Sequence, residues 1–81
     1  MKNNNIYSSK FQNCIFTYKL KQILKEKNIS IYKLEKDTGL DHKTIQNYCY
    51  GTLKRLDLNS IAIICSYLKC TFNELVSFNF E

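Results

Sequence analysis

The apolar positions from Phe16 onward repeat at the spacing of a helix face. Four of them open this pattern: Phe16, Leu20, Ile23 and Leu24. Their spacing predicts a first helix from Phe16 to about Asn28. We place the end of the helix there because asparagine tolerates the left-handed conformation that is common at helix ends.

A second, shorter helix is predicted over residues 31–38. Ser30 can cap its N-terminus by accepting a hydrogen bond from a free backbone N–H. The positions that face inward are Ile31, Leu34 and Thr38. Gly39 ends the helix, because the residue after a helix usually has a positive φ angle, which glycine adopts without steric cost.

A third helix is predicted over residues 42–50 and ends at Gly51. Asp41 is a suitable N-cap, and its carboxylate also suits the positive end of the helix dipole. Leu40 is the apolar residue inside the turn that precedes it. The positions that face inward are Ile45, Tyr48 and Cys49. Two short helices joined by a tight turn, with polar side chains pointing outward from the second, are typical of a helix-turn-helix DNA reader.

A fourth helix is predicted to begin after Asp57 or Asn59. Its apolar stripe consists of Leu58, Ile61, Ile64, Cys65 and Leu68. The sequence TFNE at residues 71–74 has the form of a capping box, in which the threonine and glutamate side chains each bond the other residue's backbone N–H. It predicts a short fifth helix through Val76, followed by a tail or a strand fragment over residues 77–81.

We therefore expect an all-α fold, a compact domain of five helices with a short N-terminal arm. Glycine is limited to Gly39 and Gly51 and proline is absent, which favours helices over a turn-rich β fold. A chain of 81 residues makes one domain. Residues 1–13 are polar and aperiodic and predict the arm, which is either flexible or lies on the domain. Residues 14–81 then form the helix-turn-helix domain.

The charge balance suits a polyanionic partner. Twelve Lys and Arg residues against seven Asp and Glu residues give a net charge of +5. No stretch approaches the roughly 20 apolar residues that a membrane span needs, and the first residues lack the apolar core of a signal peptide. The expected location is therefore the cytoplasm, in association with the nucleoid, with no membrane partner.

The sequence offers little chemistry for a metal site or for catalysis. The four cysteines form no CxxC pair, and His42 is the single histidine, so we expect no metal site and no cofactor. One histidine, no paired carboxylates at a plausible site and no glycine-rich phosphate loop leave nothing on which to build a reaction mechanism. The chain is therefore not expected to be an enzyme.

Over roughly residues 18–77 the chain contains, in order, the segments LKQIL, ISxYKLxxxTGL, DHKTIQNYCYG, TLKRLDLNSI, IAIICSYL and KCTFNELVSF. In this order and spacing they resemble the lambda-repressor-like (Cro/CI, XRE) helix-turn-helix DNA-binding family, and within it the small single-domain members. The resemblance implies that family's compact helical fold and a function in binding double-stranded DNA.

Three positions depart from the residues that are frequent in this family. Ile31 stands where glutamine is frequent, and Tyr50 stands where asparagine is frequent. Glu35 replaces a small alanine. A glutamate at this position must turn outward or find a cation such as Lys36 or Lys43.

By this resemblance, the N-terminal part of helix 42–50 meets base edges in the major groove. The expected base-contacting residues are His42, Lys43, Thr44, Gln46 and Asn47. Glutamine and asparagine can pair with adenine, lysine can donate to guanine, and the threonine methyl group can touch thymine. The residues expected to contact backbone phosphates are Tyr32, Lys33, Tyr50, Lys54 and Arg55. The simpler alternative for both sets is a solvated polar surface.

One domain of this size buries too little DNA for tight specific binding, so we expect a homodimer on half-sites one helical turn apart. The candidate interface residues are Ile63, Tyr67, Phe78 and Phe80. The competing explanation is that Phe11, Ile15 or the N-terminal arm covers them within one chain.

The leading hypothesis is a sequence-specific transcriptional regulator of double-stranded DNA, a repressor that blocks polymerase by occupying a promoter. Activation is the open alternative, and no small-molecule ligand is expected. The second hypothesis is a protein-interaction module, such as the antitoxin half of a toxin–antitoxin pair. In that case Ile31 and Tyr50 would form part of the surface for a protein partner.

Overall fold

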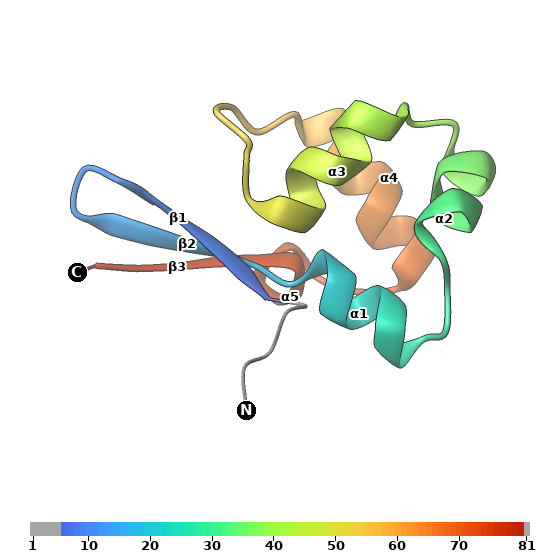
Figure 1. The fold of residues 1–81 in the computed structure, drawn as a ribbon, viewed down its shortest axis with the longest axis horizontal. Helices are drawn as coiled ribbons and strands as arrows, with labels where there is room; N and C mark the ends of the chain where they lie inside the picture. Colours follow the sequence, from blue (N-terminus) through green and yellow to red (C-terminus); the bar gives the residue numbers. More distant parts are fainter. Residues whose placement is uncertain (1–5, 81) are drawn as a thin grey trace.

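The computed structural model describes residues 6–80, which fold into five helices and one three-stranded antiparallel sheet (Figure 1). The helices are α1 (Leu20–Glu26), α2 (Ile31–Thr38), α3 (His42–Tyr50), α4 (Leu58–Leu68) and α5 (Phe72–Leu75). The strands are β1 (Tyr7–Phe11), β2 (Cys14–Tyr18) and β3 (Val76–Phe80). The expectation of an all-α fold is therefore wrong, because the chain is a mixed α/β domain.

The predicted first helix begins too early, because Phe16 lies in β2 and α1 starts only at Leu20. Residues 14–18 read CIFTY, and aromatic and β-branched residues pack well on a pleated surface. Phe16 and Tyr18 are two residues apart and so lie on the same face of the sheet. The end of the helix agrees with the prediction, since Asn28 has a φ angle of +58°.

Part of the expected N-terminal arm is a strand of the sheet. Strand β1 pairs with β2 so that Tyr7 lies opposite Tyr18 and Phe11 lies opposite Cys14, which leaves a two-residue turn. Gln12 opens this turn with a φ angle of +57°. Residues 1–5 of the expected arm lie outside the described part of the chain.

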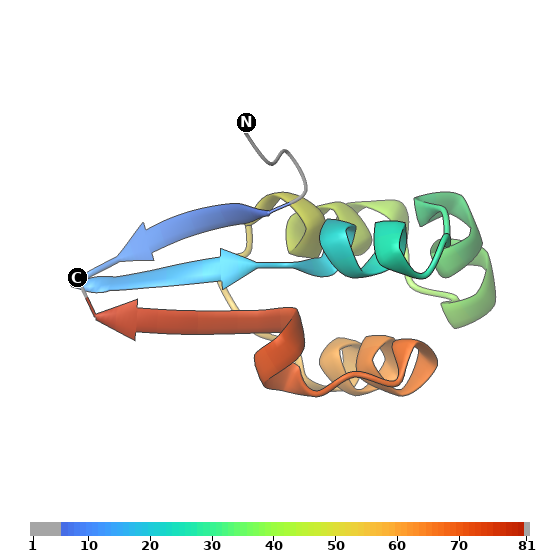
Figure 2. The ribbon, with the colours of Figure 1, turned by 90° about the horizontal axis from the view of Figure 1, so that it is seen from below.

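The C-terminal segment supplies the third strand. Strand β3 pairs with β2 and places Phe78 opposite Phe16, so the sheet order is β1-β2-β3. Val76 begins this strand and does not continue α5, whereas the alternative of a strand fragment after α5 is confirmed. Figure 2 shows the sheet extending away from the helices on one side of the molecule.

The hydrophobic core lies where the helices meet the end of the sheet that is nearest to them. Its fully buried members include Leu20, Leu34, Ile45, Tyr48, Ile64, Leu68 and Leu75. Tyr18 and Val76 carry the sheet into this core, because both are buried. Leu58 does not belong to it, contrary to the predicted stripe, because it is 78% exposed at the start of α4.

Side-chain caps fix the beginnings of the last two helices. Asp57 caps α4 by accepting hydrogen bonds from the Asn59 backbone N–H (3.2 Å) and from the Ser60 hydroxyl (2.7 Å). The predicted capping box of α5 is confirmed, with Thr71 N to Glu74 Oε1 at 2.8 Å and Glu74 N to Thr71 Oγ1 at 3.2 Å. Within residues 6–80, no helix has the length and apolar character required to cross a membrane.

Candidate nucleic-acid interface

The turn between α2 and α3 is built as the sequence predicts. Ser30 caps α2 by accepting a hydrogen bond from the Lys33 backbone N–H at 3.0 Å. Gly39 follows the helix with a φ angle of +77°. The Thr38 hydroxyl donates to the Leu34 carbonyl oxygen at 2.6 Å and accepts from the Leu40 backbone N–H at 3.3 Å. These local bonds fix the angle at which the chain enters α3.

Helix α3 is held by one buried side, formed by Ile45, Tyr48 and Cys49. Burial raises the pKa of the Cys49 thiol to about 11, so this cysteine is a packing residue with low reactivity. Gly51 ends the helix with a φ angle of +71°, and a β-carbon there would lie 2.9 Å from the Tyr18 ring. The ring of Tyr18 therefore packs directly against the end of α3, and the opposite side of the helix faces outward.

The outward side of α3 carries the five residues expected to contact bases. His42 and Lys43 are exposed, and Thr44, Gln46 and Asn47 are half-buried. Among the described residues, Lys43 and Gln46 make no side-chain hydrogen bond or ion pair within the chain. Their polar groups are therefore free to meet a ligand.

The other three residues have partners in the chain. His42 Nδ1 lies 2.5 Å from Glu35 Oε2, so the partner of Glu35 is His42 and not Lys36 or Lys43. This contact joins the start of α3 to α2. It occupies Nδ1 of the imidazole and leaves Nε2 for an external group.

Thr44 and Asn47 each form a hydrogen bond with a residue that lies just outside α3 in the sequence. The Thr44 hydroxyl donates to the Asp41 carboxylate, and this bond lowers the pKa of Asp41. Asp41 occupies the N-cap position as predicted, but its carboxylate bonds Thr44 and not a backbone N–H. Asn47 Oδ1 accepts from the Thr52 hydroxyl at 2.6 Å, which leaves the amide NH₂ of Asn47 available.

Four of the five residues expected to contact phosphate lie before or after α3 in the sequence, and Tyr50 is its last residue. Tyr32, at the start of α2, is 72% exposed. Lys33 lies beside it but forms an ion pair with Asp37, with 3.1 Å between Lys33 Nζ and Asp37 Oδ2. Asp37 raises the pKa of Lys33, which remains a cation. Its charge is partly neutralised within α2.

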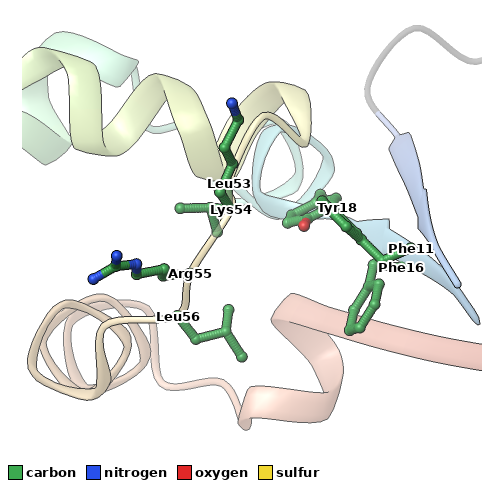
Figure 3. A pocket seen from close by; sticks show the side chains of 7 residues that line it. All are labelled: Phe11, Phe16, Tyr18, Leu53, Lys54, Arg55 and Leu56. Atoms are coloured by element: carbon green, nitrogen blue, oxygen red, sulfur yellow. The ribbon is translucent and has the colours of Figure 1, made fainter.

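Lys54 and Arg55 lie in the link from residue 52 to residue 57, and both are exposed. Figure 3 shows the Lys54 and Arg55 side chains leaving the link in different directions, with Arg55 extending away from the sheet. The link and the sheet enclose a groove lined by Phe11, Phe16, Tyr18, Leu53, Lys54, Arg55 and Leu56. Two cations therefore border the C-terminal end of α3.

Tyr50 belongs to an aromatic cluster that sequence reasoning did not find. Its ring lies 5.0 Å from the Tyr7 ring in an edge-to-face arrangement. Lys21 Nζ lies 4.9 Å from the centre of the Tyr50 ring. These contacts join the N-terminal strand, α1 and the end of α3, and no local sequence pattern marks them, because their members are far apart in the chain.

The expected dimer residues fall into two groups. On α4, Ile63 is half-buried and the Tyr67 hydroxyl donates to Asp37. On β3, Phe78 stacks on Phe16 with 5.4 Å between ring centres, yet Phe78 and Phe80 both stay exposed. The expected dimer residues are therefore only partly covered by other parts of the same chain.

The fold has a counterpart among solved structures, the crystal structure of the transcriptional regulator VanUg, form II. The two chains are 23% identical and superpose with a TM-score of 0.69, over 90% of this chain and 96% of VanUg. This likeness shows the fold alone. No curated protein sequence matches the chain.

A family model, that of the Cro/C1-type HTH DNA-binding domain, matches residues 19–81. The matched region includes the whole helix-turn-helix, the cationic link and strand β3. Helix α2, the turn at Gly39 and helix α3 form the helix-turn-helix that this family's name describes. The chain therefore belongs to the Cro/C1-type helix-turn-helix DNA-binding domain family.

Proposed function

We propose that this protein is a sequence-specific transcriptional regulator that reads the major groove of double-stranded DNA with α3. The observation that carries the proposal is the two-sided character of this helix. Ile45, Tyr48 and Cys49 are buried, while Lys43 and Gln46 face outward with no bonding partner among the described residues. The domain belongs to a DNA-binding family, and the polar groups of Lys43 and Gln46 on α3 are available to hydrogen-bond bases.

The remaining contacts follow from the same orientation. Lys43 can donate to guanine, and Gln46 and Asn47 can pair with adenine. The methyl group of Thr44 and Nε2 of His42 lie at the start of the helix, which is the part that meets base edges. Phosphate contacts by Tyr32, Lys33, Tyr50, Lys54 and Arg55 would fix the position of the domain without reading sequence.

We further propose that the protein acts as a homodimer and as a repressor in the cytoplasm, bound to the nucleoid. Two copies on inverted half-sites would supply the contact area that one small domain lacks. A dimer bound over a promoter would exclude polymerase by occupancy. Transcription in vitro from a promoter that carries the selected site should therefore fall when the protein is added.

In the alternative of a protein-interaction module, Ile31 and Tyr50 would form part of the surface for a protein partner. Ile31 packs against the hydrophobic core, and Tyr50 contacts Tyr7 and Lys21. Contacts within the chain therefore explain both residues, and neither one requires a protein partner.

Alanine substitutions of two lysines test the docking orientation. We expect Lys43→Ala to cost about 1–3 kcal/mol on a selected duplex and to change sequence preference. Lys54→Ala should weaken selected and scrambled duplexes by the same factor and reduce the slope of log affinity against log salt by about one. Fluorescence anisotropy with both duplexes at several salt concentrations measures these effects.

Lys25→Ala is the matched control, because it removes the same charge from an exposed position of α1. It should leave sequence preference unchanged. If Lys54→Ala altered sequence preference and Lys43→Ala did not, the proposed orientation of α3 on DNA would be wrong.

A further inference from the structure

His42, the first residue of α3, is held by α2 on one edge of its ring. Its Nδ1 atom lies 2.5 Å from Oε2 of Glu35. The Glu35 side chain is 20% exposed, whereas the imidazole is 64% exposed. Within residues 6–80, no other side chain bonds the imidazole. Glu35 therefore orients the ring, and Nε2 is left for a ligand at the helix end that is proposed to meet base edges.

The Glu35 contact also decides which ring nitrogen carries a proton. An ionised carboxylate accepts hydrogen bonds and cannot donate them, so the proton between the two side chains belongs to Nδ1. With Nδ1 protonated, the neutral imidazole has a lone pair on Nε2 and accepts a hydrogen bond there. The imidazolium carries a second proton on Nε2 and donates. The hydrogen-bonding character of Nε2 therefore reverses when this one proton is gained or lost.

We infer that His42 reads one base of each half-site, and that Glu35, by holding a proton on Nδ1, makes this base preference reverse with pH. The protonated ring donates from Nε2 to the keto oxygen of guanine or thymine. The neutral ring accepts at Nε2 from the amino group of adenine or cytosine. Acid conditions therefore favour a keto base and alkaline conditions favour an amino base at this position. The inference rests on the proposed function, in which the start of α3 meets base edges.

The composition of the chain makes this titration easy to isolate. His42 is the single histidine among the 81 residues. Histidine is the side-chain type that ordinarily changes charge between about pH 5 and pH 8. Burial raises the pKa of the Cys49 and Cys70 thiols to about 11, so both remain neutral in this range. A base preference that changes between these pH values therefore points to His42.

The charged surroundings of the imidazole assign the proton on Nδ1 to Glu35. Helix α3 packs against α1, α2, β1 and β2. Besides Glu35, the charged residues of these elements and of the start of α3 are Lys10, Lys21, Lys25, Glu26, Lys33, Lys36, Asp37, Asp41 and Lys43. The Asp41 carboxylate accepts from Thr44, and Lys21 lies over the Tyr50 ring at the opposite end of α3. The carboxylate in contact with the imidazole is that of Glu35.

Selection of random duplex DNA by the full chain at about pH 5.5 and at about pH 8.5 tests the inference, because these values bracket the usual titration of imidazole. The two selected sequences should differ at one base position of each half-site. Guanine or thymine is expected there at the lower pH, and adenine or cytosine at the higher pH. In fluorescence anisotropy, the affinity ratio of two duplexes that differ at this position should change about tenfold between the two pH values.

Glu35→Gln separates proton placement from simple attachment of α2 to α3. The amide keeps the shape of the side chain but can either donate to Nδ1 or accept from it. The neutral ring can then carry its proton on Nε2 and still donate, so the preference for a keto base should persist at the higher pH. His42→Gln should show one base preference at both pH values, because an amide does not titrate.

Glu26→Gln is the matched control, because it makes the same chemical change at an exposed position of α1. It should keep the pH-dependent base preference of the wild type. A wild-type preference that is identical at the two pH values would overturn the inference. So would a Glu35→Gln variant that keeps the wild-type pH dependence, because Glu35 would then only attach α2 to α3.

A loss of affinity that is equal for all duplexes as the pH rises would also overturn the inference. In that case His42 would contribute its charge to phosphate binding and would not read a base. If the protein selects no sequence at either pH, this inference and the proposed function are both wrong. If it selects the same sequence at both pH values, the proposed function stands and the inference alone is wrong.

Nitrogen chemical shifts of the imidazole in the free protein provide a test that needs no DNA. At the higher pH, NMR of the wild type should show the neutral ring of His42 with its proton on Nδ1. Glu35→Gln should shift the population toward the form with the proton on Nε2, and Glu26→Gln should leave it unchanged. A wild-type ring with its proton on Nε2 would overturn the role assigned to Glu35.

Discussion

Partners within the chain limit what three polar side chains of α3, His42, Thr44 and Asn47, can offer to DNA. Glu35 engages His42, Asp41 engages Thr44, and Thr52 engages one oxygen lone pair of Asn47. These contacts hold the three side chains in place before DNA arrives, so that less conformational entropy is lost on binding.

Asn47 can be tested separately from its intramolecular bond. Asn47→Ala should cost about 1–3 kcal/mol on the selected duplex and relax the preference for adenine at one position. Thr52→Val removes the hydroxyl that donates to Asn47 and keeps the amide, so it is the control for the bond alone. Binding titrations on duplexes that differ at single base pairs measure both. Equal losses in the two variants would mean that Asn47 positions the helix end and does not contact a base.

Asp37 links stability to pH through two partners. The Tyr67 hydroxyl and then the Lys33 ammonium group lower the pKa of Asp37 below its ordinary value of 3.8. A carboxylate with a lowered pKa stabilises the folded state above its unfolded pKa, and this contribution is lost as the pH falls through the folded pKa. Asp37→Asn should therefore lower the urea midpoint at neutral pH.

The difference between Asp37→Asn and the wild type should shrink below about pH 4 and vanish once the wild-type carboxyl is protonated. Tyr67→Phe should show the same trend with a smaller effect, because the Lys33 ion pair remains. Urea titrations of the three proteins across this pH range provide the measurement. A difference that grows as the pH falls would show that Asp37 does not stabilise the fold as a carboxylate.

Helices α2 and α3 could be predicted to the residue because their ends are marked locally. Ser30 caps one helix, and Gly39 and Gly51 each adopt the left-handed conformation that ends a helix. The sheet could not be predicted in the same way. Its hairpin turns at Gln12, which has a positive φ angle but is neither glycine nor asparagine, so the usual sequence mark of a tight hairpin is missing.

The outward residues of α3 could be predicted from the sequence, but the contacts that hold the helices in place could not. The outward residues of α3 follow from helix periodicity alone. The contacts of Tyr50 with Tyr7 and of Tyr67 with Asp37 join segments about 30 or more residues apart, and local patterns carry no information on such pairs. Tyr50 was expected to contact phosphate, and that role stays a prediction.

The two helix-ending glycines differ in their surroundings and provide a matched pair. Gly39 has open space around it, whereas a β-carbon on Gly51 would meet the Tyr18 ring at 2.9 Å. Gly39→Ala should cost about 1–2 kcal/mol, since only the left-handed backbone is strained. Gly51→Ala should cost about 2–4 kcal/mol, because the Tyr18 ring must also move. Urea unfolding measures both, and equal costs would contradict the tight packing of α3 on Tyr18.

At the scale of the whole molecule, strands from both sides of the helical region in the sequence join in one sheet, and two of them, β1 and β2, contact α3. Strands β1 and β2 come before the helices and β3 comes after them, and they meet in one sheet beside the helical core (Figure 2). The net charge of +5 adds a long-range attraction to DNA that salt weakens. Fixed orientation of α3 and general attraction to phosphate together predict binding that is both selective and salt-dependent.

The most informative measurement is the selection of random duplex DNA by the purified protein at low and at moderate salt. We expect enrichment of one palindromic sequence with half-sites about 10 base pairs apart, and this enrichment should survive moderate salt. Such a result would establish sequence recognition by a two-fold dimer. Binding at low salt without enrichment of any sequence would contradict base reading by α3.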